Sequence, residues 1–150
     1  MDYHGGNVGR VFVLKMDHGD DVLAELETFV AAENVTSAFM FMLGALSEGN
    51  VVVGPKEKQT PPTPMWFRFN DPHEIIGIGN IFNENGKPRI HLHASIGRDG
   101  NTTTGCIREE SEVFMVTEIF VLEIDDMDAE RVLNEELGCS PICFKKDERA

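Results

Sequence analysis

Apolar residues at two different spacings organise the first part of the chain. The segment 9–16, GRVFVLKM, is rich in apolar and β-branched residues, which predicts a strand. Residues 22–30 then place apolar side chains three and four positions apart, the spacing of an amphipathic helix. Asp20 or Asp21 is positioned to cap the start of this helix, and Asn34 to end it. We therefore expect a strand followed directly by a helix.

The next segment is apolar at nearly every position. Residues 36–54, TSAFMFMLGALSEGNVVVG, predict a strand that is covered on both faces, a turn around 47–50 and a further strand. The Pro- and Lys-rich segment 55–64 predicts a loop. A short strand is expected after it, over residues 65–70.

Two glycine turns mark the middle of the chain. Asn85-Gly86 lies between the strand-like runs 73–82 and 89–97, which predicts a β-hairpin. Asp99-Gly100 predicts a second turn, and a long strand is expected over 112–124. This part of the chain therefore predicts an antiparallel sheet.

The C-terminal part predicts a second helix. Residues 126–137, capped by Asp126 or Asp128 and ended by Gly138, predict a short helix. Residues 141–146 predict a closing strand, and a frayed tail is expected over 147–150. The resulting order of elements predicts an α+β fold, a mostly antiparallel β-sheet packed with two helices. With no linker or repeat, residues 1–150 are expected to form one domain.

Charge limits the function classes. The chain has 26 acidic and 13 basic residues and a formal net charge of −13. Such a surface repels phosphate backbones and anionic lipid, which disfavours DNA binding by the isolated chain. No apolar run reaches the ~20 residues that span a bilayer, and no secretory signal is visible, so we expect a cytoplasmic protein away from membranes. Three cysteines, an odd number, favour reduced thiols.

His91 and His93 are the strongest chemical signal. Residues two apart on a strand point to the same face, with their side chains roughly 6–7 Å apart at the base, so both imidazoles can converge on one ion. Histidine is a common ligand of zinc-like metals, but a catalytic zinc site usually has three protein ligands. The alternative is a polar strand face satisfied by hydrogen bonds.

A third ligand has several candidates. Counting back from the Asn85-Gly86 turn places position 80 opposite 91 and position 78 opposite 93. His73 therefore lies beyond direct reach, unless a bulge or a second subunit brings it close. The other candidates follow the second turn, and they are Asn101, Cys106, Glu109 and Glu110.

The order of these motifs resembles a known family. GRVFVLKMDHGDDVLAELETF, HEIIGIGNIF, GKPRIHLHASIG, GC and SEVFMVTEIFVLEI together resemble the PPC domain, the domain conserved in plants and prokaryotes, over about residues 8–145. The resemblance implies an α+β domain that assembles as a homotrimer. Stand-alone members are commonly labelled DNA-binding by analogy with plant proteins, in which a separate AT-hook binds the minor groove and the PPC domain contacts partners. This chain contains no AT-hook sequence.

Two departures from the family pattern affect the site. Many members have a third histidine after the His-x-His pair, and the resemblance aligns Asn101 with it; asparagine is a weak zinc ligand. In the stretch used for partner binding in plants, this chain reads DPHEI (71–75), so that His73 replaces an aromatic residue.

These observations lead to one expectation and two alternatives. We expect a homotrimeric PPC-like protein that binds a divalent metal, with zinc favoured, through His91, His93 and His73. The alternatives are a DNA-binding, transcription-associated protein, with a protein partner also open, and a metal-dependent enzyme in which Glu109 or Glu110 acts as a base.

Overall fold

The first strand and the helix form where the hydrophobic pattern predicts them. The computed structural model describes residues 1–145, and it begins with β1 (Asn7–Asp17) and α1 (Val22–Glu33). The Asp21 side chain accepts a hydrogen bond from the Ala24 N–H at 2.9 Å, which caps the helix. Asn34 ends it in the left-handed conformation, with φ 54°. The buried face of α1 consists of Val22, Leu26 and Val30.

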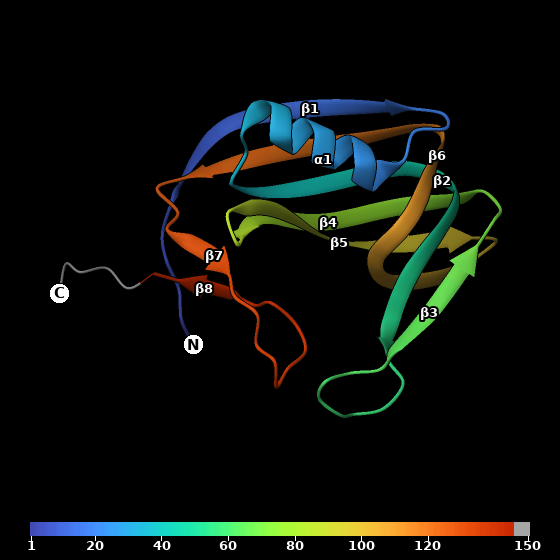
Figure 1. Cartoon of the computed structure of the whole chain (residues 1–150). Coiled ribbons are helices and arrows are strands. Elements are labelled where there is room, and N and C mark those ends of the chain that lie inside the picture. Colours follow the sequence, from blue (N-terminus) through green and yellow to red (C-terminus); the bar gives the residue numbers. More distant parts are fainter. Residues whose placement is uncertain (146–150) are drawn as a thin grey trace.

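The other elements are strands that form one sheet (Figure 1). They are β2 (Ser37–Pro55), β3 (Pro64–Phe69), β4 (His73–Glu84), β5 (Lys87–Arg98), β6 (Asn101–Asp125), β7 (Ala129–Arg131) and β8 (Ile142–Phe144). β2 pairs with both β4 and β6, β4 pairs with β5, and β5 pairs with β6, so these four strands form a closed circuit of pairings. The mostly antiparallel sheet is therefore confirmed. No helix among the described residues combines the length and apolar character needed to cross a membrane.

Two tight hairpins fix the register around β5. Asn85 and Gly86 both have positive φ, 52° and 76°, and so do Asp99 and Gly100, 50° and 76°. Positive φ at both central residues is the geometry of a two-residue hairpin turn, which Asn-Gly and Asp-Gly favour. Both predicted turns are confirmed.

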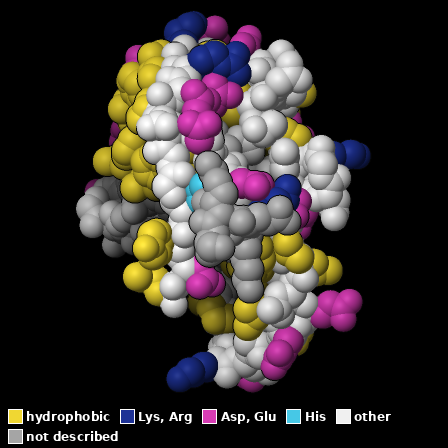
Figure 2. Space-filling view, turned by 90° about the vertical axis from the view of Figure 1, so that its left-hand side faces the viewer, with side chains coloured by type: hydrophobic (Ala, Val, Ile, Leu, Met, Phe, Trp, Pro, Cys, Tyr) yellow, Lys and Arg dark blue, Asp and Glu magenta, His cyan; other side chains and the backbone are white. Residues whose placement is uncertain are grey.

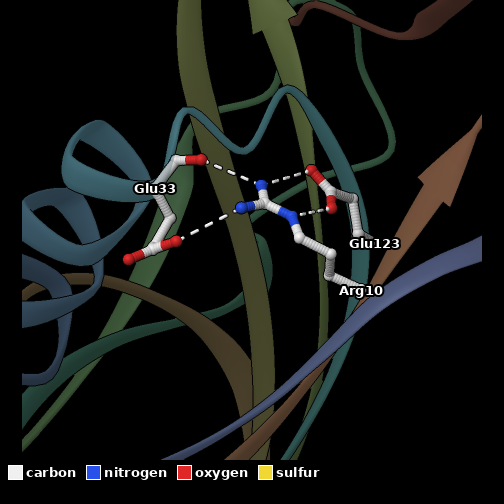
Figure 3. Close-up of polar contacts among 3 residues, drawn as sticks. All are labelled: Arg10, Glu33 and Glu123. Carbon is white, nitrogen blue, oxygen red and sulfur yellow. Dashed lines mark hydrogen bonds and ion pairs between the residues drawn. The ribbon is translucent and has the colours of Figure 1, made fainter.

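An ion-pair cluster ties the helix to the sheet (Figure 3). Arg10 of β1 donates from Nε to Glu123 of β6 at 2.7 Å and from Nη1 to Glu33 at the end of α1 at 3.2 Å. The Arg10 and Glu33 side chains are about half exposed, so solvent screening leaves this cluster a small contribution to stability.

The predicted second helix over 126–137 is wrong. Its residues instead form β7, which pairs in parallel with the end of β4 and antiparallel with β8, followed by turns. The reason is an unpaired edge: β2 pairs with β4 only as far as Phe82, so Asn83 and Glu84 still offer free backbone groups. Three apolar residues of this segment are exposed, and they are Val132, Leu133 and Leu137.

The predicted turn around 47–50 is also wrong. β2 runs through it without a break, and irregularities of register against β6 between Gly44 and Val51 bend the strand instead. β6 is longer than the expected strand as well. Its Met115, at φ 63°, interrupts the alternation and is 68% exposed, whereas Val113, Thr117, Ile119 and Val121 are buried. The predicted tail over 147–150 lies outside the described residues.

Candidate metal centre

The two hairpins bring three potential ligands together. Across the β4–β5 hairpin, His91 lies opposite Asn80 and His93 opposite Ile78, as counting from the turn predicts. Across the β5–β6 hairpin, Cys106 lies opposite His93. One ligand atom from each of His91, His93 and Cys106 lies within 4.8 Å of the other two.

The spacing of these atoms fits a tetrahedral metal ion. The Nε2 atoms of His91 and His93 are 3.1 Å apart. Two nitrogens bound to tetrahedral zinc at ~2.0–2.1 Å would lie about 3.3 Å from each other. Two imidazoles and one thiolate also suit zinc, which prefers nitrogen and sulfur ligands. Calcium and magnesium prefer oxygen ligands instead. The residues present therefore fit a zinc-like ion.

The surroundings keep both imidazoles neutral. Burial lowers the pKa of His91 to about 4, with further lowering from His93, Arg131 and Arg108. Burial and then Arg108 lower the pKa of His93. Because a neutral imidazole is the form that binds metal, both side chains have the charge state that ligation requires at neutral pH.

Cys106 differs from the histidines in its protonation. Its side chain is buried, and burial raises the pKa of the thiol, although the positive charge of Arg108 opposes this effect. The thiol therefore carries its proton at neutral pH, and a metal that bound here would displace it.

Arg131 reaches the same cluster from β7. Its Nη2 donates to the Asn80 side chain at 2.6 Å and lies 3.4 Å from Nδ1 of His91, while Nη1 donates to the Ser140 carbonyl at 2.8 Å. A guanidinium can only donate, so Nδ1 of His91 accepts and its Nε2 carries the proton toward His93. Sequence reasoning missed Arg131 because it was assigned to a helix.

The sequence alone could have placed Cys106 opposite His93. Counting across the Asp99-Gly100 turn, as was done across the first hairpin, places position 106 opposite position 93. Asn101, which the family pattern aligned with the third ligand, instead lies beside the turn opposite Arg98. Its side chain donates to the Asp99 carbonyl at 3.2 Å. The third donor of the cluster is therefore Cys106.

His73 lies at the other end of β4. It is seven residues from Asn80, or roughly 23 Å along the strand. Its Nδ1 donates to the Asp71 carbonyl at 2.6 Å, and its ring packs against Phe69. Within one chain, the structure does not bring His73 to His91 and His93.

Glu109 and Glu110, the candidates for a base, are exposed residues of β6. Among the described residues, the group of three or more potential metal ligands consists of His91, His93 and Cys106 alone. Neither glutamate belongs to it.

The fold is shared with solved structures. A metal-containing protein from Archaeoglobus fulgidus is 26% identical, with a TM-score of 0.82 over 94% of this chain and 98% of that one. A plant- and prokaryote-conserved protein from Pyrococcus horikoshii is 23% identical, with a TM-score of 0.81 over 99% of each chain. A protein from Bacteroides thetaiotaomicron, described as a candidate DNA-binding protein, is 20% identical, with a TM-score of 0.79 over 94% of this chain and 99% of that one.

A family model agrees with these structural similarities. No curated protein matches the sequence. The model of the Plants and Prokaryotes Conserved domain, abbreviated PCC or PPC, matches residues 3–125, which contain every residue of the His91–His93–Cys106 cluster. The chain belongs to this family.

Proposed function

We propose that this protein binds one divalent transition-metal ion, with zinc favoured, through His91, His93 and Cys106. The observation that carries the proposal is the convergence of their three ligand atoms within 4.8 Å at the meeting point of two hairpins. The metal-containing description of the 26% identical Archaeoglobus fulgidus protein supports it. Three protein ligands leave a fourth coordination position open. His73 could contribute there only from a second copy of the chain.

Metal analysis of the purified, untagged protein tests this proposal. We expect about one zinc per chain, because two imidazoles and a thiolate form a high-affinity set. The double substitution His91→Ala and His93→Ala should abolish the bound metal, and Cys106→Ser should weaken its retention strongly. His4→Ala is the matched control, since it removes a histidine outside the cluster. Wild-type protein without stoichiometric zinc, nickel or iron would contradict the proposal.

Assembly as a homotrimer is the second part of the proposal. Ile76 and Ile78 of β4 are 71% and 53% exposed, and they lie opposite Leu43 and Phe41 of β2, which are also exposed. Figure 2 shows hydrophobic side chains gathered along one side of the molecule. Contiguous apolar patches on a protein surface are typical of interaction sites. A second copy of the chain is the partner that the family resemblance indicates.

DNA binding is the competing function. It rests on the description of structural neighbours such as the Bacteroides thetaiotaomicron protein. The net charge of −13 opposes it, since affinity for DNA comes largely from Lys and Arg contacts to phosphate. A mobility-shift assay at low salt, where phosphate contacts are strongest, decides the question. A shift that salt abolishes would favour DNA binding, and we expect none.

A further inference from the structure

We propose that the metal centre takes a small oxyanion, of carboxylate or phosphate type, as its additional ligand, and that Arg108 and Arg131 attract it. This inference rests on the proposed metal binding. It adds the chemical class of the ligand that would occupy the open side of the site.

Charge around the cluster is the first argument. An imidazole binds a metal in its neutral form, so a divalent ion held by two imidazoles and one thiolate keeps a net positive charge. Arg108 adds a second cation, because it follows Cys106 by two residues on β6 and so lies on the same face of the strand. Its charge also acts on all three members of the cluster. Arg131 adds a third cation, whose Nη2 lies 3.4 Å from Nδ1 of His91. An anion would therefore find several positive groups converging on one place.

The second argument is that, within the described residues, neither arginine of the cluster pairs with a carboxylate. Ion pairs among residues 1–145 engage other cations, namely Arg10, Lys15, Arg89, Arg98 and Lys145. Within that range neither Arg108 nor Arg131 has such a partner. Glu84, whose charge acts on Arg131, pairs instead with Arg89 at 3.6 Å. Other basic side chains of this range, Lys56, Lys58, Arg68 and Lys87, also lack an ion pair. Arg108 and Arg131 differ from them because they lie at the ligand cluster, where an anion from solution would balance their charge.

The two arginines differ in how they can act. Arg131 is held in place by Asn80 and the Ser140 carbonyl, so it contributes mainly a fixed positive charge. Arg108 is exposed and lies near the Cys106 thiol, so its guanidinium has free donors for an incoming ligand. A guanidinium presents two parallel N–H groups that match the two oxygens of a carboxylate or phosphate. Arg108 is therefore the residue that would contact the anion.

Cobalt(II)-substituted protein tests the inference, because the visible absorption of cobalt reports changes in its coordination. Inorganic phosphate and acetate serve as the two probes. We expect at least one of them to change the spectrum saturably, and Arg108→Gln to weaken that binding about tenfold, as loss of a charged hydrogen bond would. Lys15→Gln is the control, since it removes the same charge from β1, outside the cluster.

The affinity for cobalt separates an electrostatic role from damage to the fold. If Arg108 attracts anions, Arg108→Gln should weaken the anion while leaving cobalt bound as tightly as before or more tightly. Damage to the fold would weaken the binding of both the anion and cobalt. Cobalt-loaded protein whose spectrum neither anion alters, or an Arg108→Gln variant that binds the anion like wild type, would overturn the inference. Failure to bind cobalt at all would instead overturn the metal proposal on which it rests.

Discussion

At the scale of single residues, the fold changes the chemistry of His91 most. Burial and neighbouring cations lower its pKa from 6.5 to about 4. The unfolded chain therefore binds more protons at this residue than the folded chain does between these two values. The stability that His91 contributes is present above pH 6.5 and is lost as the pH falls toward 4.

A variant that has no titrating group at position 91 should therefore lose less stability in acid than wild type does. Between about pH 7 and about pH 4.5, the urea midpoint of metal-free His91→Gln should fall less than that of metal-free wild type. Comparing the two proteins cancels the effect of the many carboxylates, which titrate in both. Equal losses would show that His91 is not held neutral by the fold.

Arg131 is predicted to oppose metal binding. A metal at Nε2 of His91 requires the proton to sit on Nδ1, where it would face the N–H groups of Arg131 at 3.4 Å. Arg131→Met removes both this conflict and a nearby positive charge. We expect its zinc affinity to rise by about tenfold, the effect of one charged hydrogen-bond conflict.

Competition with a chromophoric chelator measures this change in zinc affinity. Arg98→Met is the matched control, because Arg98 pairs with Asp71 and lies outside the ligand cluster. A decrease in affinity for Arg131→Met would mean that Arg131 supports the site rather than competing with the ion.

At the scale of elements, the close approach of β4 to its neighbours depends on glycine. A methyl group at Gly79 would lie 2.8 Å from the His91 carbonyl oxygen and 3.1 Å from Met40, whereas one at Gly97 would meet nothing closer than 3.7 Å. Gly79→Ala should therefore cost about 1–3 kcal/mol of unfolding free energy, as overpacking does. Gly97→Ala, the control on β5, should change stability by less than about 0.5 kcal/mol.

Urea unfolding of both variants measures the difference. Because the clash at Gly79 is with the backbone of His91 itself, zinc binding should weaken in the same variant. A Gly79→Ala protein as stable as Gly97→Ala would show that β4 and β5 can separate without cost.

The elements also show which features local sequence could predict. Asn85-Gly86 and Asp99-Gly100 determine their own turn geometry, so the register that places His91 opposite Asn80 follows from short-range rules. The strand β7 does not follow from them. It forms because β4 extends past β2, a feature of the assembled sheet that no window around Arg131 contains. The positions of His91, His93 and Cys106 relative to one another therefore follow from the sequence, but the cation beside them does not.

At the scale of the whole molecule, acidic charge and exposed apolar surface act on different kinds of partner. The net charge of −13 disfavours contacts with other polyanions, while the exposed face of β2 and β4 favours an apolar partner. Ile78 on this face lies opposite His93. A second copy that covered the face would therefore also lie beside the proposed metal centre.

The proposed trimer should consequently depend on this apolar face. Ile76 is 71% exposed and lies opposite Ser95 rather than a ligand, so Ile76→Glu places a charge in the proposed interface without touching the metal site. Because burial of an unpaired charge in an apolar interface costs several kcal/mol, we expect this variant to be monomeric where wild type is trimeric. Sedimentation equilibrium at micromolar concentration measures the mass of each. Val8→Glu, an equally exposed position on β1, should remain trimeric. A monomeric wild type would contradict the proposed assembly, and a trimeric Ile76→Glu would place the interface on another face.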